Sequence, residues 1–246
     1  MSVHKIFDWL FPKKCLICGN EICSDSILCP KCFAKITFIA YPFCEICGKM
    51  LDNSYNTVAD SKLLCETCEK YHRSFDKARA LFLYDEISKY VIMKIKKHAD
   101  NTVANTCCKM LVLRHMNIFA QADYIVPVPS HWSRILKRGY NPADIISIEL
   151  SKISKIPVLK LLKRIRKTEY QKGKSIQERF ENVDNAFVYA GKKNVSGKSI
   201  ILVDDVMTTG ATLHECSKAL KTHSRGKIFC ITIATTTAYR DCLSCQ

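Results

Sequence analysis

The sequence lacks both a long apolar run and an export signal. No 18 consecutive positions among its 246 residues are apolar, so we expect no membrane-spanning helix. The first ten residues carry too short an apolar run and no small-residue cleavage site, so we expect no secretory signal. Their apolar side chains suit one or two turns of an amphipathic helix docked on the protein itself, with a membrane surface as the alternative.

Acidic residues are also few. Asp and Glu total 23 against 38 Lys and Arg, which gives a formal net charge of +15. This imbalance favours an anionic partner, such as nucleic acid, a phosphorylated ligand or an acidic membrane surface. If two zinc ions bind eight of the cysteines as thiolates, the charge falls to about +11, which is still strongly basic.

The cysteines do not indicate disulfides. Nine of the fifteen fall within the first 68 residues and eight of these form C-x-x-C pairs, which indicates metal-bound thiolates in a reducing cytoplasm. A tetrahedral zinc takes two such pairs and leaves no open position, so we predict two structural zinc ions. Sharing each ion between neighbouring pairs is the simplest assignment, and a cross-braced arrangement stays open. The expected ligands are Cys15, Cys18, Cys29, Cys32, Cys44, Cys47, Cys65 and Cys68.

The composition changes near residue 73, where the cysteine-rich region ends. We therefore expect a zinc-ribbon domain over residues 1–73 and an α/β domain over residues 74–246. Apolar runs predict strands at 77–84, 124–128, 157–162, 186–189, 198–203 and 227–234. Helical spacing predicts helices at 86–97, 102–118, 141–153 and 211–222, and the polar stretch 163–182 is expected to be a mobile loop. This alternation predicts a doubly wound α/β sheet that is mostly parallel.

An apolar run at 200–203 ends in two adjacent carboxylates. The loop after them opens a predicted helix, where threonine hydroxyls and backbone N–H groups suit an anion such as a 5-phosphate. Gly210 lets the backbone approach a phosphate closely, and the two carboxylates suit ribose hydroxyls and Mg²⁺. An ordinary turn with threonine caps is the alternative. The pattern resembles the phosphoribosyl pyrophosphate (PRPP) signature of type I phosphoribosyltransferases, with expected contacts from Asp204, Asp205, Met207, Thr208, Thr209, Gly210, Ala211 and Thr212.

A second group of residues follows the predicted strand at 124–128. Val128, Pro129 and Ser130 end this strand, and Arg138 follows in a basic stretch. A strand end followed by arginine and lysine suits a pyrophosphate group. We therefore expect these four residues to contact the pyrophosphate of PRPP.

From about residue 10 to residue 235 the chain resembles the ComF family. The resemblance rests on the cysteine pairs, the signature at 200–212 and the short motifs Phe75-Asp76-Lys77-Ala78, Pro127-Val128-Pro129, Arg138-Gly139-Tyr140-Asn141, Arg166-Lys167-Thr168 and Glu178-Arg179. Two positions depart from the family pattern. Pro142 stands where the family usually has Gln, and Lys96-Lys97-His98-Ala99-Asp100 stands where it usually carries glycine.

The resemblance implies a type I phosphoribosyltransferase-like fold behind a double zinc ribbon, and binding of PRPP with Mg²⁺. It implies a role in natural transformation, where single-stranded DNA is handled beside a helicase-like partner. The implied location is the cytoplasm, with the inner face of the membrane as the alternative. Asp204 and Asp205 are the expected catalytic pair, and the expected loop contacts are Lys96, Arg164, Arg166 and Arg179.

Three functions fit these features. The first is a DNA-handling protein that binds PRPP, with Trp132, Tyr140 and Tyr170 as candidates for base stacking. The second is an active phosphoribosyltransferase, although the segment after the last predicted strand shows no base-reading hood. The third is a ligand-sensing regulator, which ranks last because no helix-turn-helix is evident.

Overall fold

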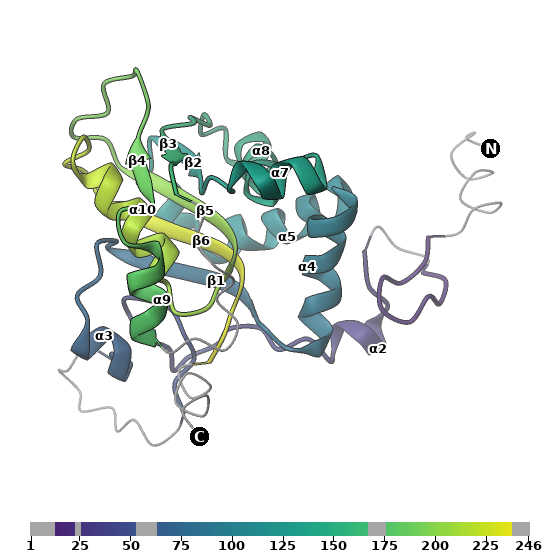
Figure 1. Cartoon of the computed structure of the whole chain (residues 1–246). Coiled ribbons are helices and arrows are strands. Elements are labelled where there is room, and N and C mark those ends of the chain that lie inside the picture. Colours follow the sequence, from purple (N-terminus) through teal and green to yellow (C-terminus); the bar gives the residue numbers. More distant parts are fainter. Residues whose placement is uncertain (1–12, 23–25, 53–62, 167–175, 238–246) are drawn as a thin grey trace.

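The computed structural model describes residues 13–22, 26–52, 63–166 and 176–237. Four parallel strands form its central sheet in the order β1-β6-β5-β2 (Figure 1). They are β1 (Lys77–Leu83), β2 (Tyr124–Pro127), β5 (Ile200–Met207) and β6 (Ile228–Thr235). Every residue of β6 is buried, as its apolar sequence and its place between two other strands require.

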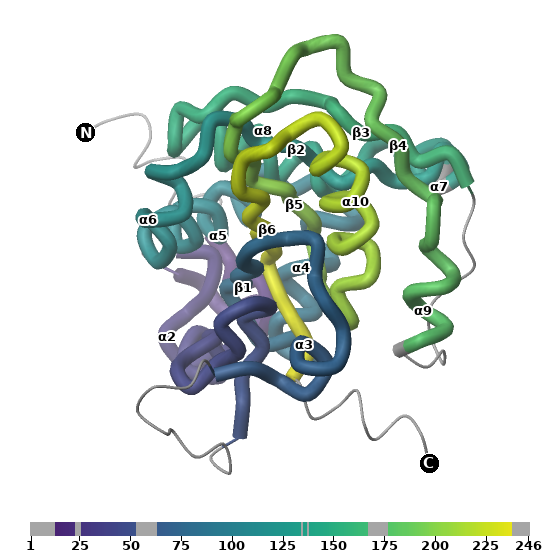
Figure 2. Tube along the Cα trace, turned by 90° about the vertical axis from the view of Figure 1, so that its left-hand side faces the viewer, coloured from purple at the N-terminus to yellow at the C-terminus, as the bar shows by residue number. Residues whose placement is uncertain are grey.

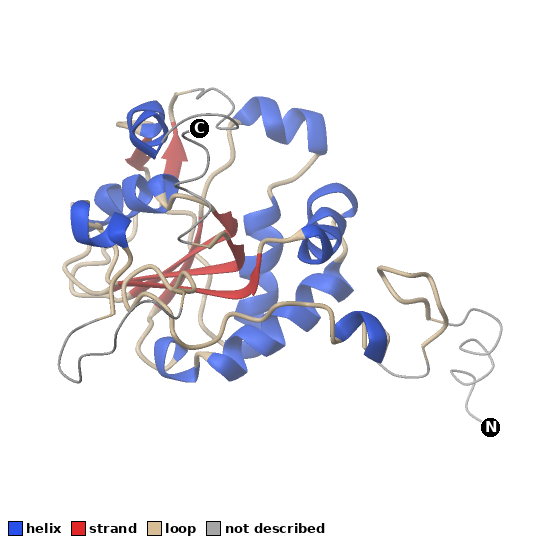
Figure 3. Cartoon of the chain, turned by 90° about the horizontal axis from the view of Figure 1, so that it is seen from below, coloured by secondary structure: helices blue, strands red, loops and turns tan. Residues whose placement is uncertain are grey.

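Helices cover both faces of this sheet. Side chains alternate along β5, so Ile201 faces the core under α4 (Glu86–His98), α5 (Asn101–Arg114) and α8 (Pro142–Ser154). Leu202 faces the opposite core, under α10 (Ala211–Lys221). The sheet lies between these layers when viewed from below (Figure 3). The predicted doubly wound α/β fold is therefore confirmed.

Helix boundaries follow from capping chemistry. Asp85 and Ser88 form a reciprocal capping box at the start of α4. The helix ends at Ala99, which has a left-handed backbone with φ of 49°. That position lies within the stretch where the resemblance leads us to expect glycine, which adopts this conformation more readily.

The predicted mobile loop at 163–182 is wrong for the described part of that stretch. Residues 167–175 lie outside the described residues, but the flanks form β3 (Leu162–Arg164) and α9 (Ile176–Val183). The helix forms because Phe180 and Val183 lie three residues apart and join the apolar core beside α10. β3 pairs antiparallel with β4 (Phe187–Tyr189) in a separate two-stranded sheet.

Three further boundaries differ from expectation. The predicted strand at 157–162 is reduced to a single bridge between Val158 and Ile125, and only its last residue, Leu162, belongs to a strand, β3. The helix predicted to 118 breaks at His115 and resumes as α6 (Met116–Phe119). A short helix not predicted from the sequence, α7 (Trp132–Arg138), follows β2. The expected helix in the first ten residues lies outside the described residues.

The cysteine-rich segment packs against β1, and two short helices lie in it, α2 (Pro30–Phe33) and α3 (Glu66–Lys70). The Ile39 N–H donates to the Leu81 carbonyl at 3.1 Å, and the Leu83 N–H donates to Thr37 at 2.8 Å. The residues around Phe38 thus run antiparallel to β1 and cover its outer edge. The division at residue 73 stays a prediction, with these hydrogen bonds crossing it.

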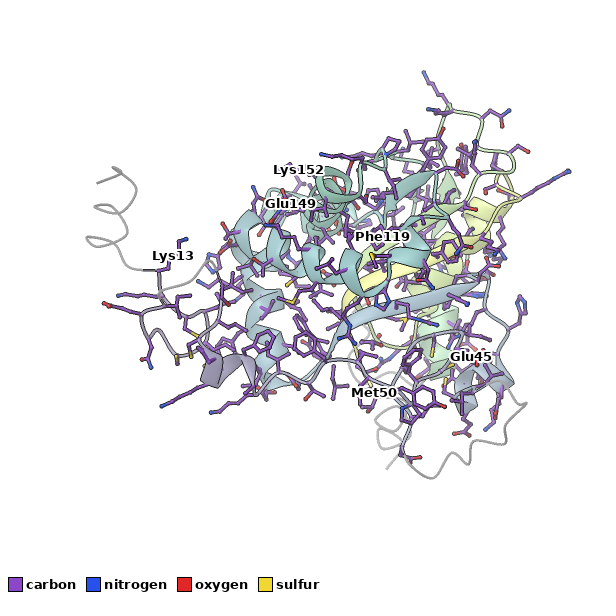
Figure 4. The ribbon with its side chains drawn as sticks, turned by 180° about the vertical axis from the view of Figure 1, so that it is seen from behind. Lys13, Glu45, Met50, Phe119, Glu149 and Lys152 are labelled. Atoms are coloured by element: carbon purple, nitrogen blue, oxygen red, sulfur yellow. The ribbon has the colours of Figure 1, made fainter. Side chains whose placement is uncertain are left out.

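The two halves of the ribbon lie on different sides of the sheet. Lys13 begins the first half, whereas Glu45 and Met50 belong to the second half on the opposite side of the molecule (Figure 4). In the second half, Gly48 has φ of 70° and lies against the backbone of Ala78. In the tube view, the purple and dark blue segment that carries α2 and α3 lies on the same lower side of the molecule as β1 (Figure 2).

Candidate functional site

Eight cysteines form two metal sites. The four sulfur atoms of each cluster lie within 4.8 Å of one another. The Sγ–Sγ distances of 3.7 Å between Cys18 and Cys29, and 3.5 Å between Cys47 and Cys65, suit the edge of about 3.8 Å of a tetrahedron with zinc–sulfur bonds of about 2.3 Å. Each cluster joins neighbouring pairs, which decides between the two assignments that the spacing left open. The clusters are Cys15, Cys18, Cys29 and Cys32, and Cys44, Cys47, Cys65 and Cys68.

These donors fit structural zinc. Four thiolates complete the tetrahedron, so no position remains for a substrate or a water molecule. Seven of the eight cysteines are buried and only Cys18 is exposed, which restricts access of solvent to the sulfurs. The sites therefore hold the ribbon together and offer no open coordination position for catalysis.

The predicted phosphate loop joins β5 to α10 at the carboxyl edge of the sheet. Gly210 is the N-cap of α10 and has φ of 78°, which glycine adopts without strain. Thr209 is buried, and its hydroxyl accepts from the Ala211 N–H at 3.4 Å. The segment after β6 supports the loop, because the Thr236 N–H donates to the Met207 carbonyl at 3.2 Å.

The two carboxylates lie where β5 leaves the core. Burial and, after it, the neighbouring charge of Asp205 together raise the pKa of Asp204 to about 7, against the opposing effects of the Asp205 N–H and two nearby cations. Asp205 forms an ion pair with Lys96, whose Nζ lies 3.0 Å from its Oδ1. Lys96, near the end of α4, therefore lies beside the carboxylate pair. The oxygen donors of the two carboxylates fit a hard cation such as Mg²⁺.

The predicted pyrophosphate loop lies beside this edge and is held by Asn141. The Asn141 side chain donates to the Val128 carbonyl at 2.9 Å and accepts from the Ser130 hydroxyl at 2.8 Å. Asn141 stands at the N-cap position of α8, one residue before the helix begins, but its side chain does not cap that helix. It fixes the shape of the 128–130 loop instead. Arg138 is exposed at the end of α7.

The three arginines expected as loop contacts have different surroundings in the structure. Arg164 is close enough to Asp204 for its positive charge to lower the pKa of that carboxyl. Arg166 instead donates to the backbone carbonyls of Asn182 and Asp184, so it ties β3 to the end of α9. Arg179 is half-buried on α9.

Comparisons with known proteins decide the family. Residues 6–69 match the model described as a double zinc ribbon domain, and residues 133–242 match that of the phosphoribosyl transferase domain. The chain is 33% identical over 219 residues to competence protein F of Haemophilus influenzae, covering 86% of this chain and 92% of that protein. The chain belongs to the ComF family.

Other members of the ComF family match over similar lengths. Competence protein ComFC of Bacillus subtilis is 24% identical over 239 residues, covering 89% of this chain and 90% of that protein. The DNA utilization protein YhgH of Escherichia coli K12 is 28% identical over 217 residues, covering 84% and 83%. Among solved structures, a purine phosphoribosyltransferase from Pyrococcus horikoshii aligns with a TM-score of 0.36 and 16% identity, covering 54% of this chain and 83% of that one. None of the described helices of this ComF chain is long and apolar enough to cross a bilayer.

The roles of two residues at the site, Tyr140 and Arg73, were not predicted from the sequence. The Tyr140 hydroxyl accepts from the Ala99 N–H at 2.9 Å, so the ComF motif Arg138-Gly139-Tyr140-Asn141 fastens the end of the helix that carries Lys96. Tyr140 is half-buried and occupied by this hydrogen bond. The second is Arg73, a buried arginine beside the phosphate loop. Neither residue stands in a periodic pattern that could have revealed its partner.

Proposed function

We propose that this ComF protein binds PRPP with Mg²⁺ at the carboxyl edge of its sheet and handles single-stranded DNA in the cytoplasm during DNA uptake. The observation that supports PRPP as the ligand is the arrangement of residues at the junction of β5 and α10. There Asp204 and Asp205 stand beside the phosphate loop and Lys96. Ligands of open α/β sheets bind at this edge.

Each part of the ligand has a matching group in this proposal. The loop from Thr208 to Thr212 takes the 5-phosphate at the positive end of α10. The two carboxylates take the ribose hydroxyls and Mg²⁺. The 128–130 loop and Arg138 take the pyrophosphate. Lys96 neutralises Asp205 in the absence of ligand.

The first test is calorimetric titration of Mg²⁺–PRPP into the wild-type protein and the double variant Asp204→Asn with Asp205→Asn. We expect binding in the wild type and no measurable binding in the double variant, with the unfolding transition retained. Asp123→Asn is the matched control, because Asp123 is a carboxylate at the opposite edge of the sheet, beside Ser199. Equal affinity in the wild type and the double variant would refute the site.

Support for DNA handling comes from α7 and from the names of the relatives. Trp132 is 65% exposed next to the predicted pyrophosphate loop, as a base-stacking side chain must be. The chain is basic overall, and two curated relatives are competence proteins and one a DNA utilization protein. Tyr170 lies outside the described residues. A helicase-like partner at the inner face of the membrane belongs to the same proposal.

We expect Trp132→Ala to weaken binding of a short single-stranded oligonucleotide about 5- to 100-fold, as the loss of one stacked base does. Leu136→Ala is the control, because Leu136 is a similarly exposed apolar residue on the same helix but cannot stack. Fluorescence anisotropy at several salt concentrations measures both, and a steep salt dependence is expected. If the two substitutions weaken binding equally, Trp132 does not stack a base.

Pentosyl transfer from PRPP is the second candidate function. Arg164 acts on Asp204 from β3, so the beginning of the polar stretch 163–182 lies near the carboxylates. Closure of such a segment over a ligand excludes water before transfer. Release of pyrophosphate from PRPP on addition of a nucleobase or an oligonucleotide tests this function. PRPP that stays intact with every acceptor identifies a binding protein instead.

A further inference from the structure

Arg73 is a buried cation that has no counter-ion in the part of the chain that the structure describes. Its side chain is 5% exposed, and its Nε and Nη1 atoms have no hydrogen-bond partner among the described residues. The guanidinium lies 5.1 Å from the ring centre of Phe180 and 6.0 Å from that of Phe75. Ring contacts of this kind recover only part of the hydration that a buried charge loses. The described residues thus leave this buried positive charge without an ion pair.

This cation lies beside the phosphate loop. A Cβ placed on Gly210, the N-cap of α10, would lie 3.5 Å from Nη1 of Arg73. The next residue fixes the backbone there, because the Ser74 N–H donates to Nδ1 of His214 in the first turn of α10 at 3.1 Å. The positive end of α10 and a fixed guanidinium therefore meet at one place.

We propose that Arg73 is a ligand-binding residue that binds the 5-phosphate of a phosphoribosyl ligand together with the loop at Gly210. The proposal rests on the PRPP site proposed above and adds a cation to it. A guanidinium offers parallel N–H donors that match two phosphate oxygens. The cation comes from the segment just after Cys68, so the ribbon and the α/β domain share one ligand.

The test uses the full-length, zinc-loaded protein and two probes. Ribose 5-phosphate carries the monoester that Arg73 would bind, whereas inorganic pyrophosphate is expected at the 128–130 loop. We expect Arg73→Met to weaken ribose 5-phosphate and PRPP by about 10- to 100-fold, as expected for removal of a charge-assisted hydrogen bond, and to leave pyrophosphate unchanged. Arg225→Met is the control, because this exposed arginine lines a hollow of about 540 Å³ with Ser199 and Lys227 at the opposite edge of the sheet.

A stability measurement separates binding from a structural role. Methionine removes an uncompensated buried charge, so the urea midpoint of the unliganded Arg73→Met protein is expected to be unchanged or higher. A structural arginine predicts a lower midpoint and unchanged affinity, and that pair of results would overturn the proposal. Arg73→Gln serves the same comparison if the methionine variant does not fold.

The outcomes separate this inference from the function proposed above. If the wild type binds ribose 5-phosphate through Arg73 but does not bind PRPP, the phosphate site stands and the PRPP function fails. If PRPP binds equally to wild type and Arg73→Met, the function stands and the role of Arg73 fails. If the wild type binds neither probe nor PRPP, both fail.

Discussion

His115 is kept uncharged at the boundary between α5 and α6. Its Nε2 atom is buried without a hydrogen-bond partner among the described residues. Burial lowers the pKa of His115 to about 4, and the nearby charges of Arg79 and Arg114 act in the same direction, against a hydrogen bond with the Ala80 backbone. The unfolded chain therefore takes up a proton at a pH where the folded protein does not.

This difference predicts acid sensitivity. Histidine in the unfolded chain titrates near pH 6.5, so stability is lost as the pH falls from about 6.5 towards 4. After allowance for partial exposure, we expect His115→Gln to reduce the loss between pH 7 and 5 by about 1 kcal/mol. Urea unfolding of both proteins at each pH, with saturating zinc, measures the difference. Parallel losses in the two proteins would contradict it.

At the residue scale, sequence reasoning found the groups that belong to a local pattern. Asp204 and Asp205 directly follow an apolar run in the sequence. Lys96 is expected at the site from the ComF resemblance. In the structure, Lys96 and Asp205 form an ion pair. His115 and Arg73 could not be found this way. Their chemistry depends on partners far away in sequence, such as Arg79 for His115 and Phe180 for Arg73.

The end of α4 carries a residue in an unfavourable conformation. Ala99 has φ of 49°, where a Cβ costs about 1 kcal/mol relative to glycine. We expect Ala99→Gly to raise the free energy of unfolding by about 0.5–1 kcal/mol, measured by urea unfolding. Ala120→Gly is the matched control, because Ala120 ends α6 with φ of −65° and glycine there is expected to destabilise. Destabilisation by both substitutions would show that Ala99 is not strained.

Gly19 and Gly48, each of which directly follows a C-x-x-C pair, provide a second matched pair of substitutions. Gly19 and Gly48 have φ of 74° and 70°, but only Gly48 has a neighbour, the Ala78 backbone, where a Cβ would stand. We expect Gly19→Ala to cost about 1 kcal/mol from conformation alone. Gly48→Ala is expected to cost about 3 kcal/mol, because Ala78 must also move. Thermal unfolding of the zinc-loaded proteins compares the two variants. Equal losses of stability would mean that the Ala78 backbone moves at little energetic cost.

At the element scale, long periodic segments were predicted and short ones were not. α4, α8, α10 and the central strands follow clear apolar spacing. β3, α7 and α9 have three, seven and eight residues, too few to show a period within a polar stretch. α9 forms because α10 offers an apolar surface to Phe180 and Val183, which is tertiary information absent from the local sequence.

At the scale of the whole molecule, removal of zinc tests the predicted division at residue 73. Chelation is expected to remove hydrogen-exchange protection from residues 15–68, whereas β5 and β6 keep a cooperative transition. β1 loses its outer hydrogen bonds to Ile39 and Thr37, so the α/β domain is expected to lose about 1–3 kcal/mol. Simultaneous loss of protection in β5 and in the ribbon would contradict two separate domains.

The position of β6 has a consequence for how the chain is made. β6 is the last of the described strands along the chain, yet it lies between β1 and β5, and its Phe229 pairs with Lys77 at the start of β1. At about 5–20 residues per second, a ribosome takes roughly 8–30 seconds to produce the approximately 150 residues between them. During that interval β1 has no strand neighbour, and the segment around Phe38 is the partner already synthesised. Zinc uptake by the nascent chain would therefore protect this strand against aggregation until β6 has been synthesised.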